Sequence, residues 1–171
     1  MELLAFVQNS IDRFSDMTGR VLAWLCLLMM IILCAVVFIR YGLETGSIAL
    51  QESVTYLHGT IFMLGAAYTL RHDGHVRVDI FYRSMTQRTK AWVNCIGGIV
   101  FLLPLCVYFF ISSWGFVQQS WELREVSTEP GGIPAVFLLK SLIPLMALSL
   151  GLQGFAEILR NLSLLIARED A

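Results

Sequence analysis

Charged side chains are scarce in this sequence. Only 15% of its 171 residues are Asp, Glu, Lys or Arg, whereas 57% are hydrophobic. Soluble domains are closer to roughly a quarter charged and half apolar. The formal net charge is −1, and the sequence contains neither a basic run nor an aromatic RNA-binding motif. This composition favours a membrane protein and argues against a nucleic-acid partner.

Cysteine and histidine are also few, with four and three residues. The sequence has no C-x-x-C pair, and every cysteine lies within an apolar stretch, which argues against thiol redox chemistry. Haem held by two histidines needs both at matching depth in a helix bundle, and only His58 lies deep in such a stretch. A haem- or quinone-associated membrane anchor of a redox enzyme therefore remains an alternative in which His58 needs a second ligand. The cysteines are Cys26, Cys34, Cys95 and Cys106.

Long apolar stretches are what the sequence does have. They cover 21–39, 53–70, 91–121 and 133–156, and only Lys140 interrupts the last. About twenty helical residues cross a hydrocarbon core roughly 30 Å thick, and lipid cannot satisfy free backbone groups. We therefore predict an all-α membrane protein with four transmembrane helices in one domain over 1–171. The expected spans are about 21–40, 48–70, 91–117 and 133–158.

The first twenty residues carry their own pattern. Leu3, Phe6, Val7 and Ile11 recur at helical spacing, which predicts an amphipathic helix on the membrane surface over 1–20. A frayed tail is the alternative. The apolar run that follows is longer than that of a signal peptide, and no cleavage pattern succeeds it, so we expect it to be retained.

Lys and Arg are distributed unevenly between the two ends of the expected helices. Nine of the twelve lie before the first span, between spans two and three, or after span four. The other three are Arg40, Arg124 and Lys140. Because positive charge collects on the cytoplasmic side, we expect both termini and the 71–90 segment to be cytoplasmic in a bacterial inner membrane.

The segment after the second span reads TLRHDGHVRVDIFY at 69–82. Asp73-Gly74 is a turn signal, and the apolar and basic residues that follow suit a segment at the lipid interface, in contact with headgroups. The histidines and aspartates are of metal-ligand type, but their spacing matches no metal-binding signature. We therefore predict no metal and expect local hydrogen bonding and lipid-headgroup contact instead. The polar residues of this predicted cytoplasmic loop are Arg71, His72, Asp73, His75, Arg77 and Asp79.

Polar groups inside the spans are expensive to bury and therefore informative. Glu52 and Lys140 lie at similar depth near the outer ends of spans two and four. We expect them to pair with each other or to meet a polar group of another subunit, with snorkelling to the outer surface as the alternative. Tyr56 and His58 join them as candidates for an intramembrane polar or subunit interface.

A proton-coupled carrier using Glu52 is a further alternative. Small residues expected to allow close helix packing are Gly59, Gly65, Ala147, Gly151 and Gly154.

Three stretches together resemble one protein family. They are LQESVTYLHGTIFMLGAAYTLRHDGHVRVDIFY (50–82), FLLPL (101–105) and STEPGGIPAVFLLKSLIPLMALSLGLQGFAEILR (127–160). They are similar to the small membrane (Q-type, DctQ-like) subunit of tripartite ATP-independent periplasmic (TRAP) transporters. The resemblance covers most of the chain and is weakest before residue 45.

The resemblance implies a function and partners. Such a subunit would be a scaffold that braces a large (M-type) permease subunit, which carries a small organic acid with sodium ions. A periplasmic binding protein would deliver the substrate, and membrane lipids would surround the helices. The resemblance implies neither an enzyme activity nor a cofactor, and it assigns no substrate-binding residue to this chain.

Overall fold

The computed structural model describes residues 2–76 and 79–167, and the regular structure in this part of the chain is entirely helical. The helices are α1 (Glu2–Gly42), α2 (Ile48–Arg71), α3 (Asp79–Tyr82), α4 (Gln87–Gly97), α5 (Leu103–Glu122) and α6 (Val136–Ala167). A π-helical turn, η1 (Gly98–Leu102), joins α4 to α5 without a break.

Helix α1 differs from the sequence expectation. The predicted surface helix over 1–20 and the first span are one continuous helix of 41 residues. The segment has no proline, and Gly19 alone does not interrupt the backbone hydrogen bonds. At a rise of about 1.5 Å per residue, α1 is about 60 Å long, roughly twice the hydrocarbon thickness of a bilayer.

The connection from α4 to α5 is also continuous, and Pro104 gives a reason for its π turn. Proline lacks a backbone N–H, and its ring needs room beside the preceding helical turn. In η1 the Leu103 N–H donates to the Gly98 carbonyl, five residues back. This wider turn admits Pro104 without breaking the helix. The result is one uninterrupted run from Gln87 to Glu122.

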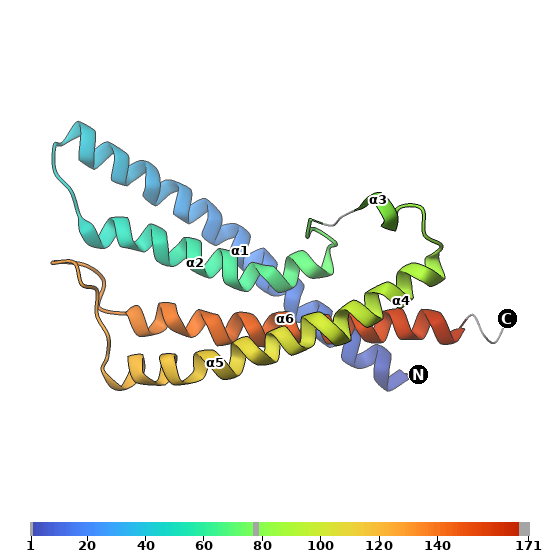
Figure 1. Cartoon of the computed structure of the whole chain (residues 1–171). Coiled ribbons are helices and arrows are strands. Elements are labelled where there is room, and N and C mark those ends of the chain that lie inside the picture. The colour runs from blue at the N-terminus through green and yellow to red at the C-terminus, as the bar shows by residue number, and fades with distance from the viewer. Residues whose placement is uncertain (1, 77–78, 168–171) are drawn as a thin grey trace.

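The long helices run side by side in the order α1, α2, α6 and α5 over much of their length (Figure 1). Both termini and α4 lie at one end, which we call the terminal end. The connections 43–47 and 123–135 lie at the opposite end, which we call the loop end (Figure 1). Near the terminal end α1 crosses α6, so its first half contacts a helix from the other end of the sequence.

Small residues lie where the helices approach most closely. A Cβ on Gly59 would be 3.1 Å from Leu139 of α6, and one on Gly154 would be 2.5 Å from Leu102 of η1. Gly65 faces Leu22 of α1, Gly151 faces Cys106 of α5, and Ala147 is 2% exposed. The four glycines singled out in the sequence therefore lie at helix contacts, and Ala147 is buried.

Three of these helical segments are long and apolar enough to cross a membrane: Leu4–Gly42, Gln87–Glu122 and Val136–Ile166. The sequence analysis predicted a fourth at 48–70. Helix α2 has closely matching bounds, Ile48–Arg71, but it is less apolar because it carries Gln51, Glu52 and His58.

Candidate functional site: two polar clusters at the ends of the helices

At the terminal end, side chains of α1 and α6 form a buried polar contact. Gln153 of α6 is fully buried, and its amide donates to Asp12 Oδ1 of α1 over 3.0 Å. Its carbonyl oxygen accepts a hydrogen bond from Ser15 Oγ over 2.6 Å. Two turns further along α6, Arg160 Nη2 donates to Asp12 Oδ2 over 2.6 Å. Asp12 therefore binds two groups of α6 at the crossing of the two helices.

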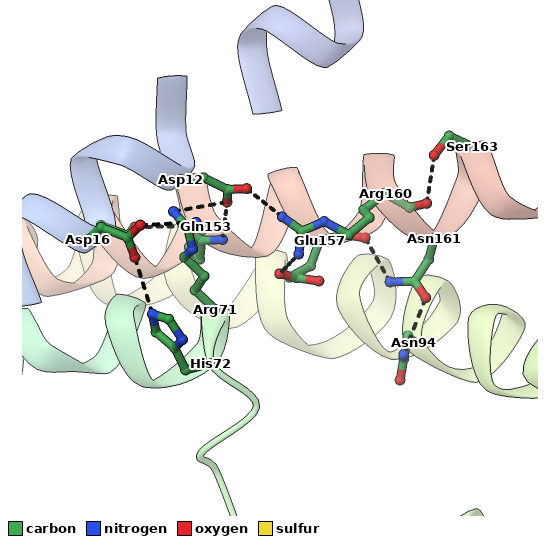
Figure 2. A network of polar contacts seen from close by, with 11 residues as sticks. Asp12, Asp16, Arg71, His72, Asn94, Gln153, Glu157, Arg160, Asn161 and Ser163 are labelled. Atoms are coloured by element: carbon green, nitrogen blue, oxygen red, sulfur yellow. Dashed lines mark hydrogen bonds and ion pairs between the residues drawn. The ribbon is translucent and has the colours of Figure 1, made fainter. Parts of the chain in front are cut away.

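The end of α2 joins the same group of side chains (Figure 2). Arg71 Nη2 lies 3.0 Å from Asp16 Oδ2, and Arg71 Nη1 lies 3.9 Å from Asp12 Oδ1. The neighbouring His72 places Nε2 3.1 Å from Asp16 Oδ1. Asp12 and Asp16 are four residues apart, so both carboxylates project from one face of α1 towards α2 and α6.

Further contacts extend from α6 to α4 and α3. Arg160 Nη1 donates to Glu157, at an i, i+3 spacing that brings the two side chains to one face of the helix. Asn94 of α4 donates to Asn161 Oδ1 over 3.3 Å, and the Tyr82 hydroxyl at the end of α3 donates to Asn94 over 3.2 Å. We call these residues the terminal-end cluster: Asp12, Ser15, Asp16, Arg71, His72, Tyr82, Asn94, Gln153, Glu157, Arg160 and Asn161.

The terminal-end cluster links α1, α2 and α6 where α1 crosses α6. Hydrogen bonds to charged groups contribute about 1.5–3 kcal/mol each, and an orphaned buried partner costs a similar amount. Apolar helix faces can slide past one another, whereas Asp12 fits its partners on α6 in one register only. The cluster therefore supports a rigid arrangement of α1, α2 and α6.

At the loop end, Glu52 anchors the 123–135 connection to α2. Its carboxylate accepts the hydroxyl hydrogen of Ser127 and the backbone N–H of Ile133, the latter over 2.6 Å. Gly132 lies against the side chains of Ser127 and Glu52, and a Cβ there would be 2.8 Å from Glu52 Oε1. The Pro-Gly-Gly-Ile-Pro stretch at 130–134 thus needs glycine where the chain passes over Glu52.

Lys140 has a different partner from the one considered in the sequence. Its ammonium group donates to Glu125 Oε2 over 2.5 Å and lies 3.9 Å from the centre of the Phe116 ring. Glu125 also accepts from Ser120 Oγ over 2.6 Å. Glu52 and Lys140 thus do not pair with each other in this structure, because each binds the 123–135 connection or its flanks. These hydrogen bonds, Lys140 first and Ser120 second, hold the pKa of Glu125 below its usual value.

Tyr56 and His58 lie on different sides of α2. Tyr56 is partly buried, whereas His58 is exposed and stacks on Phe62, with ring centroids 6.3 Å apart. Haem ligands in a helix bundle project inward from facing helices, but His58 projects outward.

The residues of the predicted interfacial loop form a turn and make side-chain contacts with α1 and α2. Asp73 has φ 54, and the Gly74 N–H donates to the Thr69 carbonyl over 2.9 Å, which confirms the turn signal. His75 Nε2 lies 3.3 Å from the Ala66 carbonyl oxygen. Arg71 and His72 bind carboxylates of α1. Arg77 lies outside the described residues, and Asp79 begins α3.

A match to a known protein family covers the loop-end residues Glu52, Glu125 and Lys140 and part of the terminal-end cluster. A family model described as tripartite ATP-independent periplasmic transporters, DctQ component, matches residues 29–164. The chain belongs to the DctQ family. In TRAP transporters the DctQ component is the small membrane subunit, and it works with the DctM permease and the DctP binding protein. Searches of curated proteins and of solved structures each found no significant match.

The match divides the terminal-end cluster of this DctQ subunit. Arg71, Gln153 and Arg160 lie inside the matched range, whereas Asp12 and Asp16 precede it. Sequence reasoning missed Asp12, Gln153 and Glu125 as site residues. A signal was available: Asp12 and Asp16 stand four apart in a helix with many apolar residues, and Lys140 needed a nearby carboxylate.

Proposed function

We propose that this DctQ subunit is the scaffold of a sodium-coupled TRAP transporter in the bacterial inner membrane. It braces the large permease subunit, which carries a small organic acid such as a 2-oxo acid or a dicarboxylate. The subunit forms a single domain, and it supplies no catalytic, metal-binding or substrate-binding group. The family match over residues 29–164 is the observation that carries this proposal.

The polar clusters support a bracing role. Asp12 of α1 binds Arg71 of α2 and Arg160 of α6, and Glu52 and Lys140 hold the 123–135 connection at the loop end. Ionisable groups used in this way hold helices in place. A proton carrier instead needs a carboxylate that changes partners, and Glu52 is held by a backbone N–H and a hydroxyl.

The arrangement also favours four membrane crossings with both termini in the cytoplasm. Helix α1 returns through the short connection 43–47 into α2, which runs back to the terminal end (Figure 1). With 24 residues α2 is about 36 Å long, enough to span a bilayer. If α1 crosses the membrane, α2 must cross it in the opposite direction, despite its polar residues.

The test separates bracing from substrate recognition. The transported acid is first selected by thermal-shift screening of the partner DctP protein against mono-, di- and 2-oxo acids. Cells expressing the DctM permease and DctP are then compared with and without this subunit, measuring DctM abundance and sodium-dependent uptake of that acid. Omission should abolish uptake.

Three substitutions refine the same experiment. His58→Gln, His72→Gln and His75→Gln should change the abundance of the complex while leaving the apparent KM for the acid unchanged. A several-fold rise in KM at normal abundance of the complex would contradict the scaffold role. Uptake that is independent of this subunit would contradict it as well.

A further inference from the structure

One face of α2 presents a stripe of exposed side chains, three of which are polar. Gln51, Thr55, His58 and Phe62 follow one another at intervals of four, three and four residues, so they lie on one side of the helix. All four are exposed. We call these residues the α2 stripe.

The polar groups of the α2 stripe have no hydrogen-bonding partner among the described residues, although other polar groups of the same helix do. Thr60 and Thr69 return their hydroxyls to the carbonyls of Tyr56 and Gly65, over 2.8 and 2.9 Å. Thr55 makes no such bond, and the ring contact of His58 is with Phe62.

The depth of His58 makes its exposure significant. It stands ten residues after the start of α2, which places it about 15 Å along a helix about 36 Å long. Gln51 can reach the polar end of the helix, but His58 lies near the middle. Lipid offers a ring N–H and a ring nitrogen no partner there, so ionisable side chains at such depth normally face protein or a water-filled cavity. By contrast, Ile31 of α1 and Ile111 of α5 are exposed and apolar, as lipid contact requires.

We propose that the α2 stripe is the surface on which a transmembrane helix of the DctM permease docks, with His58 hydrogen-bonded to a polar side chain of that helix. This inference rests on the proposed function. Thr55 is small enough for close approach beside His58, and Phe62 provides apolar contact further along the helix. The stripe excludes Glu52 and Lys140, whose partners lie within this chain.

A second copy of this chain fits the stripe less well than the permease. In a two-fold contact along α2, the groups that could bond to His58 would be those of an identical stripe: the Thr55 hydroxyl, the Gln51 amide and the His58 imidazole. A different helix can supply a carboxylate or carbonyl that matches the imidazole. The family works with a membrane permease, which can provide such a helix.

The test uses the complete transporter, purified through a tag on this subunit. Thr55→Trp and His58→Trp should lower the co-purified permease about tenfold, because a bulky ring opens a close helix contact. Ile31→Trp and Ile111→Trp, at exposed apolar positions on α1 and α5, should leave it unchanged. A photo-crosslinking phenylalanine analogue at Phe62 should form an adduct of the permease's mass, and one at Ile111 should not.

The outcomes are distinguishable. If the wild-type subunit fails to bring down the permease, the proposed function fails and the docking surface fails with it. If the wild type does so and both stripe variants do so equally well, only the docking surface is wrong. An adduct at Phe62 with a second copy of this chain, or with lipid alone, also overturns it. Because the analogue replaces one aromatic ring with another, this readout decides even if the Trp variants accumulate poorly.

Discussion

Individual charges at the loop end have separate tasks. Lys140 lies in the first turns of α6, where its ammonium group lies over the Phe116 ring and donates to Glu125. Glu52, on α2, binds the Ser127 hydroxyl and the Ile133 backbone. Both residues hold the 123–135 connection, but through different atoms.

This division predicts which pairs of substitutions are coupled. Lys140→Met and Glu125→Gln remove the same ion pair, so the double substitution should lower the unfolding midpoint in detergent little more than either single one. Lys140→Met and Glu52→Gln should have nearly additive effects, since their partners differ. Additivity within the Lys140–Glu125 pair would show that the two do not interact.

The same pair predicts a pH dependence. The folded pKa of Glu125 is lowered, chiefly by the Lys140 hydrogen bond. Its contribution to stability is therefore present above the usual glutamate pKa and is lost as the pH falls through the lowered value. Between about pH 7 and about pH 3, Glu125→Gln should lose less stability than the wild type. Glu129→Gln, at an exposed position in the same connection, should leave the acid dependence unchanged.

At the scale of the helices, the contact of α1 with α2 depends on one missing side chain. A Cβ on Gly19 would lie 2.2–2.6 Å from the Tyr68 ring of α2. That ring is itself held against His72, with centroids 4.3 Å apart. A displacement of the Tyr68 ring would change its contact with His72, which belongs to the terminal-end cluster. Gly19 therefore permits the close approach that the cluster requires.

Gly19→Ala should consequently destabilise the subunit by about 1–3 kcal/mol, the usual cost of forcing an extra group into a packed contact. Gly115→Ala is the matched control, because Gly115 lies in α5 and a Cβ there would meet no neighbouring group within 4 Å. Alanine there should be neutral or stabilising by about 0.5–1 kcal/mol, since it favours the helix. Equal midpoints for the two variants in denaturant unfolding in detergent would contradict the close approach.

The sequence predicted the helices better than their contacts. The expected span 48–70 has nearly the bounds of α2, Ile48–Arg71, although the apolar run itself begins only at residue 53. The same reasoning divided α1 at residue 20, since a change from amphipathic to apolar pattern need not break the backbone. The pairing of Asp12 with Arg160 is 148 residues distant in sequence, and hydrophobic periodicity carries no information on such partners. The similar predicted depth of Lys140 and Glu52 in the membrane suggested them as a pair. Glu125, the partner of Lys140, lies in the 123–135 connection and was not considered.

At the scale of the whole molecule, lysine and arginine residues are distributed unevenly between the terminal end and the loop end. The terminal end holds α4, with Arg88 and Lys90, the end of α2, with Arg71, and the last turns of α6, with Arg160 (Figure 1). The loop end holds the end of α1, with Arg40, the 123–135 connection, with Arg124, and the first turns of α6, with Lys140 (Figure 1). Positively charged segments resist transfer across the inner membrane. We therefore predict that the terminal end faces the cytoplasm and the loop end faces the periplasm.

Cysteine labelling tests this orientation together with the crossing of α2. In a variant without Cys26, Cys34, Cys95 and Cys106, a single cysteine is placed at Ser84 or at Thr128, both of which are exposed. A membrane-impermeant maleimide added to intact, outer-membrane-permeabilised cells should label Thr128→Cys, and should reach Ser84→Cys only after the inner membrane is opened. The reverse pattern would mean that the loop end faces the cytoplasm.

Glu44→Cys, in the α1–α2 connection, should behave like Thr128→Cys, because α1 and α2 both cross the membrane in this arrangement. Protection of Glu44→Cys in intact cells would mean that α1 and α2 do not cross as proposed, and that the polar face of α2 does not lie within the bilayer.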